Sequence, residues 1–227
     1  MSLRAALHQL REAEAQLNAG APRPFPLPAR GLEAVIAGGF LGVDQRDWVV
    51  PGLRERVGAV LRSCPVERLM DGFAGARPYR VAPITDDPAA RMLHACGLAM
   101  ADPEVAVLCF IGQGSAACGA FHEALNLAAL HKLHVIFLAH RWNLDDPDAP
   151  VAPQIAGTLA AKALAYGVHA RSVDGGLITE VLSAVVDAKA HGGPHLIEAH
   201  IERGEDPLSR AYDELTETDP AASQQVV

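Results

Sequence analysis

The stretch VAVLCFIGQGSAACGAFHEALNLAALHKLHVIFLAHRW, residues 105–142, decides the fold of this chain. It begins with an apolar run, Val105 to Ile111, which is typical of a strand buried on both faces. The turn Gly112-Gln113-Gly114 comes next, and from Ser115 to Leu130 apolar side chains recur three and four residues apart, as on one face of a helix. A second apolar run, Val135 to Ala139, predicts another strand. This order of elements forms a βαβ unit, which requires a parallel sheet.

The glycine turn is the part of this unit that can carry chemistry. Glycine permits a positive φ and lets a ligand approach the backbone closely. At a helix N-terminus, the free N–H groups of Ser115, Ala116 and Ala117 would attract a phosphate group. A turn of this kind can equally serve packing alone, so the residues by themselves leave both interpretations open.

The rest of the chain alternates in the same way between helical and extended patterns. Helices are predicted at residues 2–19, 31–43, 53–62, 66–73, 87–100, 155–166 and 177–191, with a loop at 74–85. Extended segments are predicted at 48–51, 168–173 and 195–201. Such alternation predicts an α/β fold, a doubly wound and mainly parallel sheet with helices on both faces.

Three parts are predicted along the chain. Residues 1–30 form an N-terminal helix and a proline-rich arm, residues 31–210 a single α/β domain, and residues 211–227 a polar tail. The arm, APRPFPLPAR, is stiff and extended. It fits either a structural arm laid over the domain or a partner, or a ligand for a proline-binding module.

Composition narrows the classes of function. A net charge of −8 argues against nucleic acid or an anionic membrane as the main partner. The four cysteines have no C-x-x-C spacing and lie in or beside apolar runs, as buried free thiols do in a reducing compartment. Neither a signal peptide nor an apolar run of membrane-spanning length is present, so we expect a cytoplasmic protein.

Three segments together resemble a known family. They are GLEAVIAGGFLGVDQRDWVVPGLRERVGAVL (31–61), GQGSAACGAFHEALNLAALHKLHVIF (112–137) and AAKALAYGVHARSVDGGLITEVLSAVVDAKAHGGPHLIEAHIERG (160–204). In this order they resemble the α subunit of the thiamine-diphosphate-dependent first component of 2-oxo acid dehydrogenase complexes. That family typically reads GDGA, then FHEALN-type residues, then a strand ending in ENN or QNN.

The resemblance implies a cofactor site whose metal ligands are altered here. In the family, the acid of GDG and the second asparagine of ENN hold the Mg²⁺ that bridges the cofactor's diphosphate. Gln113 stands at the acid's position, and the ENN triplet falls on His140, Arg141 and Trp142. Mg²⁺ prefers charged and carbonyl oxygens, so Mg²⁺ binding is not expected unless Asn143, one residue late, takes part.

Other parts of the family's site are retained or lost. Arg54 matches the arginine that contacts the diphosphate. The glycine-rich KGRGGSMH segment and the later histidine loop have no counterparts. The cofactor-binding residues implied by the resemblance and by the turn are Arg54, Gly112, Gln113, Gly114, Ser115 and Arg141, with no catalytic or metal-binding residue assigned.

Two functions follow from this mixture. The first is a divergent α-like subunit that works with a β-like partner in oxidative decarboxylation of a 2-oxo acid. The second is a catalytically inactive paralogue that serves as a binding or scaffolding subunit. The helices at 31–43 and 115–130 are expected to leave apolar surface for such a partner or for a homodimer.

Some smaller features remain open at this point. Arg141 can stand in for the missing metal as a phosphate-binding cation, or it can pair with Asp145 or Asp146. His131 and His134 suggest either a metal pair or surface histidines at a helix end, and the surface interpretation is preferred.

Overall fold

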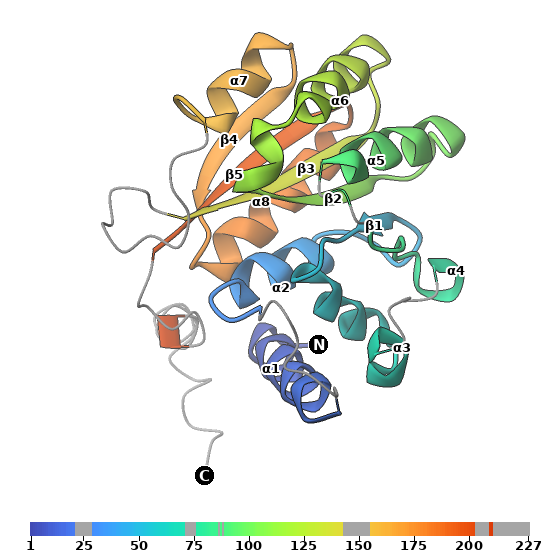
Figure 1. The fold of residues 1–227 in the computed structure, drawn as a ribbon, viewed down its shortest axis with the longest axis vertical. Coiled ribbons are helices and arrows are strands. Elements are labelled where there is room, and N and C mark those ends of the chain that lie inside the picture. Colours follow the sequence, from blue (N-terminus) through green and yellow to red (C-terminus); the bar gives the residue numbers. More distant parts are fainter. Residues whose placement is uncertain are drawn as a thin grey trace.

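Five parallel strands form one sheet in the order β1-β2-β3-β5-β4 (Figure 1). The computed structural model describes residues 1–20, 29–70, 76–85, 87, 89–142, 155–202 and 209–210. The strands are β1 (Trp48–Val50), β2 (Val107–Gly112), β3 (Val135–Trp142), β4 (His169–Asp174) and β5 (His195–Ile201). All five segments predicted to be extended are thus confirmed as strands, and β3 continues three residues beyond the predicted end at Ala139.

Helices cover both faces of the sheet, as a doubly wound fold requires (Figure 1). One face carries α1 (Leu3–Gly20), α2 (Glu33–Leu41), the 3-10 helix η1 (Glu55–Arg62), α3 (Val66–Met70) and α8 (Ile178–His191). The other carries α5 (Ala90–Ala101), α6 (Gly119–Leu130) and α7 (Leu159–Ala165). The predicted α/β class is confirmed.

Strand β2 shows how the sheet separates the two cores. Its side chains alternate, so Leu108 and Phe110 join the core beneath α2 and α8. Cys109 and Ile111 join the core beneath α5 and α6. Because every one of these side chains is fully buried, the strand reads in sequence as one continuous apolar run.

Helix α2 lies unusually close to its neighbours because two of its residues lack side chains. A Cβ atom placed on Gly39 would lie 2.6 Å from Cζ of Phe110, and one on Gly38 would lie 2.8 Å from Cβ of Val181. The close packing expected of this small-residue helix is therefore confirmed. The expectation that it leaves apolar surface for a partner is wrong, since residues 33–40 are all buried within the chain.

The segment after the glycine turn differs from its prediction. A 3-10 helix, η2, spans Gln113–Ala117, and Cys118 then adopts an extended backbone, with φ −91° and ψ 150°. The α-helix starts only at Gly119, four residues later than predicted. The N–H groups of residues 115–117 thus belong to a short 3-10 turn. Ser115 and Ala116 in this turn are buried beside the sheet.

Other segments also differ. Helix α7 begins at Leu159, four residues later than predicted. Residues 55–62 form a 3-10 helix, in which an added Cβ on Gly58 would lie 2.2 Å from Cε2 of Phe40. The predicted loop at 74–85 contains a short helix, α4 (Ala76–Tyr79). Within the described part of the chain, no helix has both the length and the hydropathy needed to cross a membrane. Most of the proline-rich arm (21–28), the aspartate loop (143–154) and the tail (211–227) lie outside the described residues.

Candidate functional site

A pocket of about 320 Å³ lies at the carboxyl ends of β1, β2 and β3. This is the edge of a parallel sheet at which ligands of doubly wound folds bind. The segments that follow β1 and β2, the last residues of β3 and helix α5 all contribute to it. Its lining consists of Leu53, Arg54, Glu55, Arg91, Gly112, Gln113, Gly114, Ser115, Cys118, His140 and Trp142.

Glu55 is the carboxylate at the centre of this pocket. One of its oxygens lies 2.8 Å from Nε2 of His140. The other accepts a hydrogen bond of 2.9 Å from the backbone N–H of Gly52 and lies 3.8 Å from Nη1 of Arg91. Only 3% of its side chain is exposed. The carboxylate is therefore already occupied by His140, Arg91 and one backbone donor.

The pKa of Glu55 shows which of these influences prevails. Burial alone would raise it, because the charged form loses its hydration. The hydrogen bond from His140 and the charges of His140 and Arg91 outweigh burial, and the pKa lies below its usual value of 4.5. Glu55 is thus an ionised carboxylate held by its neighbours.

Gln113 also lines the pocket, but its side chain lacks the hydrogen-bond partners that Glu55 has. It is buried, and neither the amide oxygen nor the amide nitrogen has a hydrogen-bond partner among the described residues. An unpaired buried amide is costly, at about 1–3 kcal/mol for each group. A ligand that both donates and accepts hydrogen bonds would remove this cost, which makes Gln113 a candidate contact for a bound group.

Most of the residues predicted to bind a cofactor come together here. Arg54, Gly112, Gln113, Gly114 and Ser115 all line the pocket. Arg54 is the only one of these with a positive charge, and it brings that charge close to the glycine turn.

Arg141 does not line the pocket. Successive side chains of a strand point to opposite faces, so His140 and Trp142 reach the pocket while Arg141 points away from it. Its guanidinium donates a 3.0 Å hydrogen bond to Glu198 and a 3.1 Å bond to the carbonyl of Gly157. The interpretation of Arg141 as the phosphate-binding cation is therefore not supported by its position. Its predicted alternative partners, Asp145 and Asp146, lie outside the described residues.

Sequence reasoning missed a second arginine that reaches the pocket beside Arg54, namely Arg91. Its guanidinium lies beside Glu55 and 3.5 Å from the carbonyl oxygen of Phe110. The available signal was a single arginine at the start of a helix made mainly of small and apolar residues, ARMLHACGLAMA. Cys118 was also misjudged: it is exposed and lines the pocket, whereas the other three cysteines are buried.

The pocket's donors do not suit Mg²⁺. A hard divalent cation needs several oxygen ligands, with carboxylates preferred. Among the described residues that line the pocket, Glu55 is the one carboxylate, and it is bound by His140 and the Gly52 N–H. Gln113 offers a neutral amide, and Trp142 offers no ligand atom. By contrast, Arg54 and Arg91 against a single carboxylate leave an excess of positive charge, which suits an anion.

Replacing Glu55 by glutamine is expected to lower the free energy of unfolding by about 1–3 kcal/mol at pH 7, because the new amide N–H₂ faces donors. The folded pKa of Glu55 lies below 4.5, so its stabilisation is complete above that pH and is lost as the pH falls through the folded pKa. Urea titrations of both proteins between neutral and acidic pH should therefore converge below pH 4.5. The matched control is the same change at exposed Glu104. A difference between wild type and Glu55→Gln that is independent of pH would contradict this account.

Comparison with known families gives a consistent result. The family described as "Dehydrogenase E1 component" matches residues 1–206. The 2-oxoisovalerate dehydrogenase subunit alpha of Bacillus subtilis is 29% identical over 92% of this chain and 74% of its own length. The pyruvate dehydrogenase E1 component subunit alpha of Mycoplasma genitalium is 30% identical over 75% of this chain. The 3-methyl-2-oxobutanoate dehydrogenase subunit alpha of Mycobacterium tuberculosis is 30% identical over 76%. This chain spans about half the length of the last two relatives (52% and 51%).

Solved structures agree on the fold. A transketolase from Campylobacter jejuni superposes with a TM-score of 0.68 at 21% identity, covering 95% of this chain and 42% of that one. A protein from Mycobacterium smegmatis described as a "putative thiamin diphosphate-dependent enzyme" gives a TM-score of 0.53 at 18% identity, over 76% of this chain and 32% of its own. At these identities the likeness shows a shared fold.

Proposed function

Because this chain belongs to the dehydrogenase E1 component family, we propose that it is a divergent α-like subunit of a thiamine-diphosphate-dependent 2-oxo acid dehydrogenase, with a pocket that takes a phosphate-bearing group without Mg²⁺. The observation that carries the proposal is the state of Glu55. The one pocket carboxylate among the described residues is bound to His140 and the Gly52 N–H beside Arg91, while the glycine turn presents Gln113. The positive charge that a bound metal would supply comes instead from arginine.

The residues proposed to hold the phosphate group follow from the pocket lining. Arg54 is a guanidinium, which stays protonated and can pair with two phosphate oxygens at once. The glycine turn lets such a group approach the backbone, and the Gln113 amide can donate to it. Thiamine diphosphate, when bound, supplies the chemistry of decarboxylation. This chain's own residues position its anionic end.

A β-like chain is the proposed partner. The relatives are alpha subunits by name, and a subunit so designated works beside another chain. Helix α6 offers an exposed leucine at its end, Leu130 at 72% exposure, next to exposed Asn126 and Glu123. A homodimer that uses the same helix is the alternative arrangement.

A second function is favoured by the same pocket. The Glu55, His140 and Arg91 cluster satisfies its charges internally, as a site that has lost its metal would. The chain would then be a catalytically inactive scaffolding subunit, related to the enzyme family by fold and assembly only.

One experiment separates these functions. The chain is purified alone and after co-expression with a β-like chain from the same genome, and each sample is tested for bound thiamine diphosphate by mass spectrometry and for decarboxylation of pyruvate and branched 2-oxo acids. A complex that carries cofactor and turns over supports the enzyme subunit. A stable complex without cofactor supports the scaffold. A chain that stays a 23.9 kDa monomer with every β-like partner overturns both.

The metal-free pocket makes a separate prediction. Calorimetric titration of the chain with thiamine diphosphate should give the same dissociation constant with and without Mg²⁺. Arg54→Ala is expected to weaken binding by about tenfold, the equivalent of one charge-assisted hydrogen bond. Gln113→Asp is the matched gain-of-function variant, since it returns a carboxylate to the turn and should introduce a response to Mg²⁺. Micromolar binding by the wild-type chain that depends on Mg²⁺ would contradict the proposal.

A further inference from the structure

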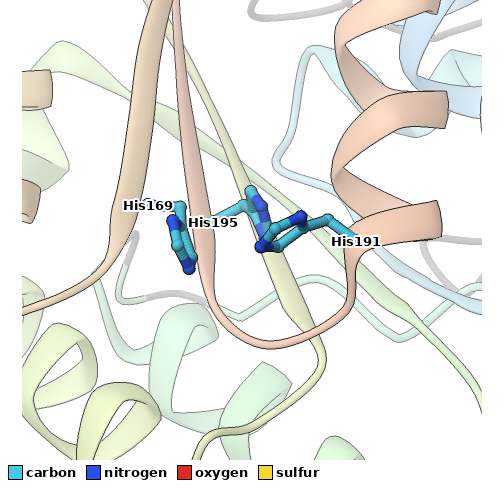
Figure 2. Close-up of side chains that lie close together, drawn as sticks. All are labelled: His169, His191 and His195. Atoms are coloured by element: carbon cyan, nitrogen blue, oxygen red, sulfur yellow. The ribbon is translucent and has the colours of Figure 1, made fainter.

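Three histidines gather at the edge of the sheet opposite the pocket, where β4 and β5 begin (Figure 2). His169 is the first residue of β4, and His195 is the first residue of β5, directly opposite it in the parallel register. His191 is the last residue of α8. One ring nitrogen from each lies within 4.8 Å of those of the other two. Three imidazoles from three different elements therefore converge on one small volume.

The chain turns sharply to bring His191 back onto His195. The connecting sequence is Gly192-Gly193-Pro194, and both glycines have positive φ, +72° and +73°. Nothing lies within 4 Å of where a Cβ would be on either glycine. The glycines are therefore needed for their backbone conformation and not to avoid a steric clash. The tight turn leaves the rings of His191 and His195 with centroids 5.4 Å apart, and those of His169 and His195 only 5.0 Å apart.

The hydrogen bonding of His195 favours its ligand form. Its Nδ1 lies 3.3 Å from the carbonyl oxygen of Gly193. A carbonyl can only accept, so Nδ1 donates and the other ring nitrogen keeps its lone pair. Metal-binding histidines usually make this second hydrogen bond, which fixes the tautomer and the ring orientation.

The surroundings leave room for a metal ion with an open coordination position. A cavity of about 220 Å³ is lined by the three histidines together with Arg171 and Asp187. Arg171 and Asp187 pair with each other at 3.2 Å, so the charges beside the histidines largely cancel. Nitrogen ligands of a tetrahedral zinc ion lie about 3.3 Å apart, as follows from Zn–N distances of about 2.05 Å. Side-chain rotations at this exposed edge can bring the three nitrogens to that spacing.

We propose that His169, His191 and His195 form a binding site for a divalent transition metal ion, with zinc as the expected ion and water completing its coordination. Imidazole suits zinc, copper and nickel, whereas Mg²⁺ and Ca²⁺ prefer oxygen. The site is separate from the pocket at the carboxyl edge and does not depend on the function proposed for that pocket. By joining the ends of α8, β4 and β5, a bound ion would tie together three elements at one edge of the sheet.

The test is calorimetric titration of the metal-free chain with ZnCl₂ in a non-chelating buffer. We expect one zinc ion per chain with a dissociation constant below about 10 µM. His169→Asn and His195→Asn should each weaken binding by about 100-fold, because each removes one of three ligands. The matched control is His131→Asn, which alters an exposed histidine outside the cluster and should bind zinc like the wild type.

A second measurement guards against variants that do not fold. Co²⁺ added to the wild-type chain should give the visible absorption of a tetrahedral, nitrogen-ligated ion, and Zn²⁺ should abolish it by competition. Binding weaker than about 10 µM, or loss of less than tenfold in the two cluster variants, would overturn the proposal. Loss of zinc binding in His131→Asn would overturn it as well, because the site would then lie at the end of α6.

Discussion

Glu198→Ala should lower the free energy of unfolding by about 3–5 kcal/mol, the cost of leaving a buried charge without its partner. Glu198 lies on β5 and is fully buried. One carboxylate oxygen accepts from Arg141 at 3.0 Å, and the other accepts from the backbone N–H of Ala160 at 3.0 Å. Its removal leaves the guanidinium of Arg141, which is only 16% exposed, without its carboxylate, and it leaves the backbone N–H of Ala160 in α7 without this acceptor. Urea unfolding at neutral pH measures the loss.

A double-mutant cycle tests the cause of this loss. Arg141→Ala combined with Glu198→Ala removes the stranded charge along with the carboxylate. The double variant should therefore be markedly more stable than the sum of the two single losses predicts. Glu198→Gln, which keeps an acceptor for Arg141, should lose less than Glu198→Ala. Additive losses would mean that the ion pair contributes nothing beyond packing.

Phe110→Ala should cost a similar amount, about 3–5 kcal/mol, for a different reason. Phe110 is central in β2 and fully buried. Its ring stacks on Phe40 at 5.5 Å between centroids and fills the space left by Gly39 of α2. Truncation opens a cavity between helix and sheet that the backbone of α2 cannot close, because α8 holds the helix from its other side at Gly38.

The control for this variant keeps volume and removes the ring. Phe110→Leu should cost less than half as much as the alanine variant, since most of the apolar contact is retained. A Gly39→Ala change in the Phe110→Ala background should recover part of the loss, because the new methyl group occupies the cavity. An alanine variant as stable as wild type would show that α2 is free to settle onto the sheet.

The fold could be predicted from local patterns because the central strands β2 and β3 are buried on both faces. Strand β5 was predicted with its observed ends, His195 and Ile201. The parallel direction of the strands follows from the βαβ unit. The 3-10 conformations at 55–62 and 113–117 could not be predicted, because they depend on how closely Gly58 and Ser115 pack against distant segments.

The site was predicted less completely than the fold. The glycine turn and Arg54 could be located by chain position, since both follow directly after strands. Arg141 was misplaced because the predicted strand ended at Ala139. In the structure β3 continues through His140, Arg141 and Trp142, so their side chains alternate between the two faces of the sheet. His140 and Trp142 therefore face the pocket, and Arg141 does not. Arg91 and the histidine cluster depend on side chains that meet only in three dimensions.

The alternation at the end of β3 restricts how this pocket could change over evolutionary time. A step toward asparagine at position 141 would uncover the carboxylate of Glu198, which lies in the interior and has no other side-chain cation recorded within bonding distance among the described residues. A substitution that removes the guanidinium of Arg141 is therefore expected to cost less when Glu198 changes with it. Because Arg141 and Glu198 are paired, a substitution at either position alone is costly.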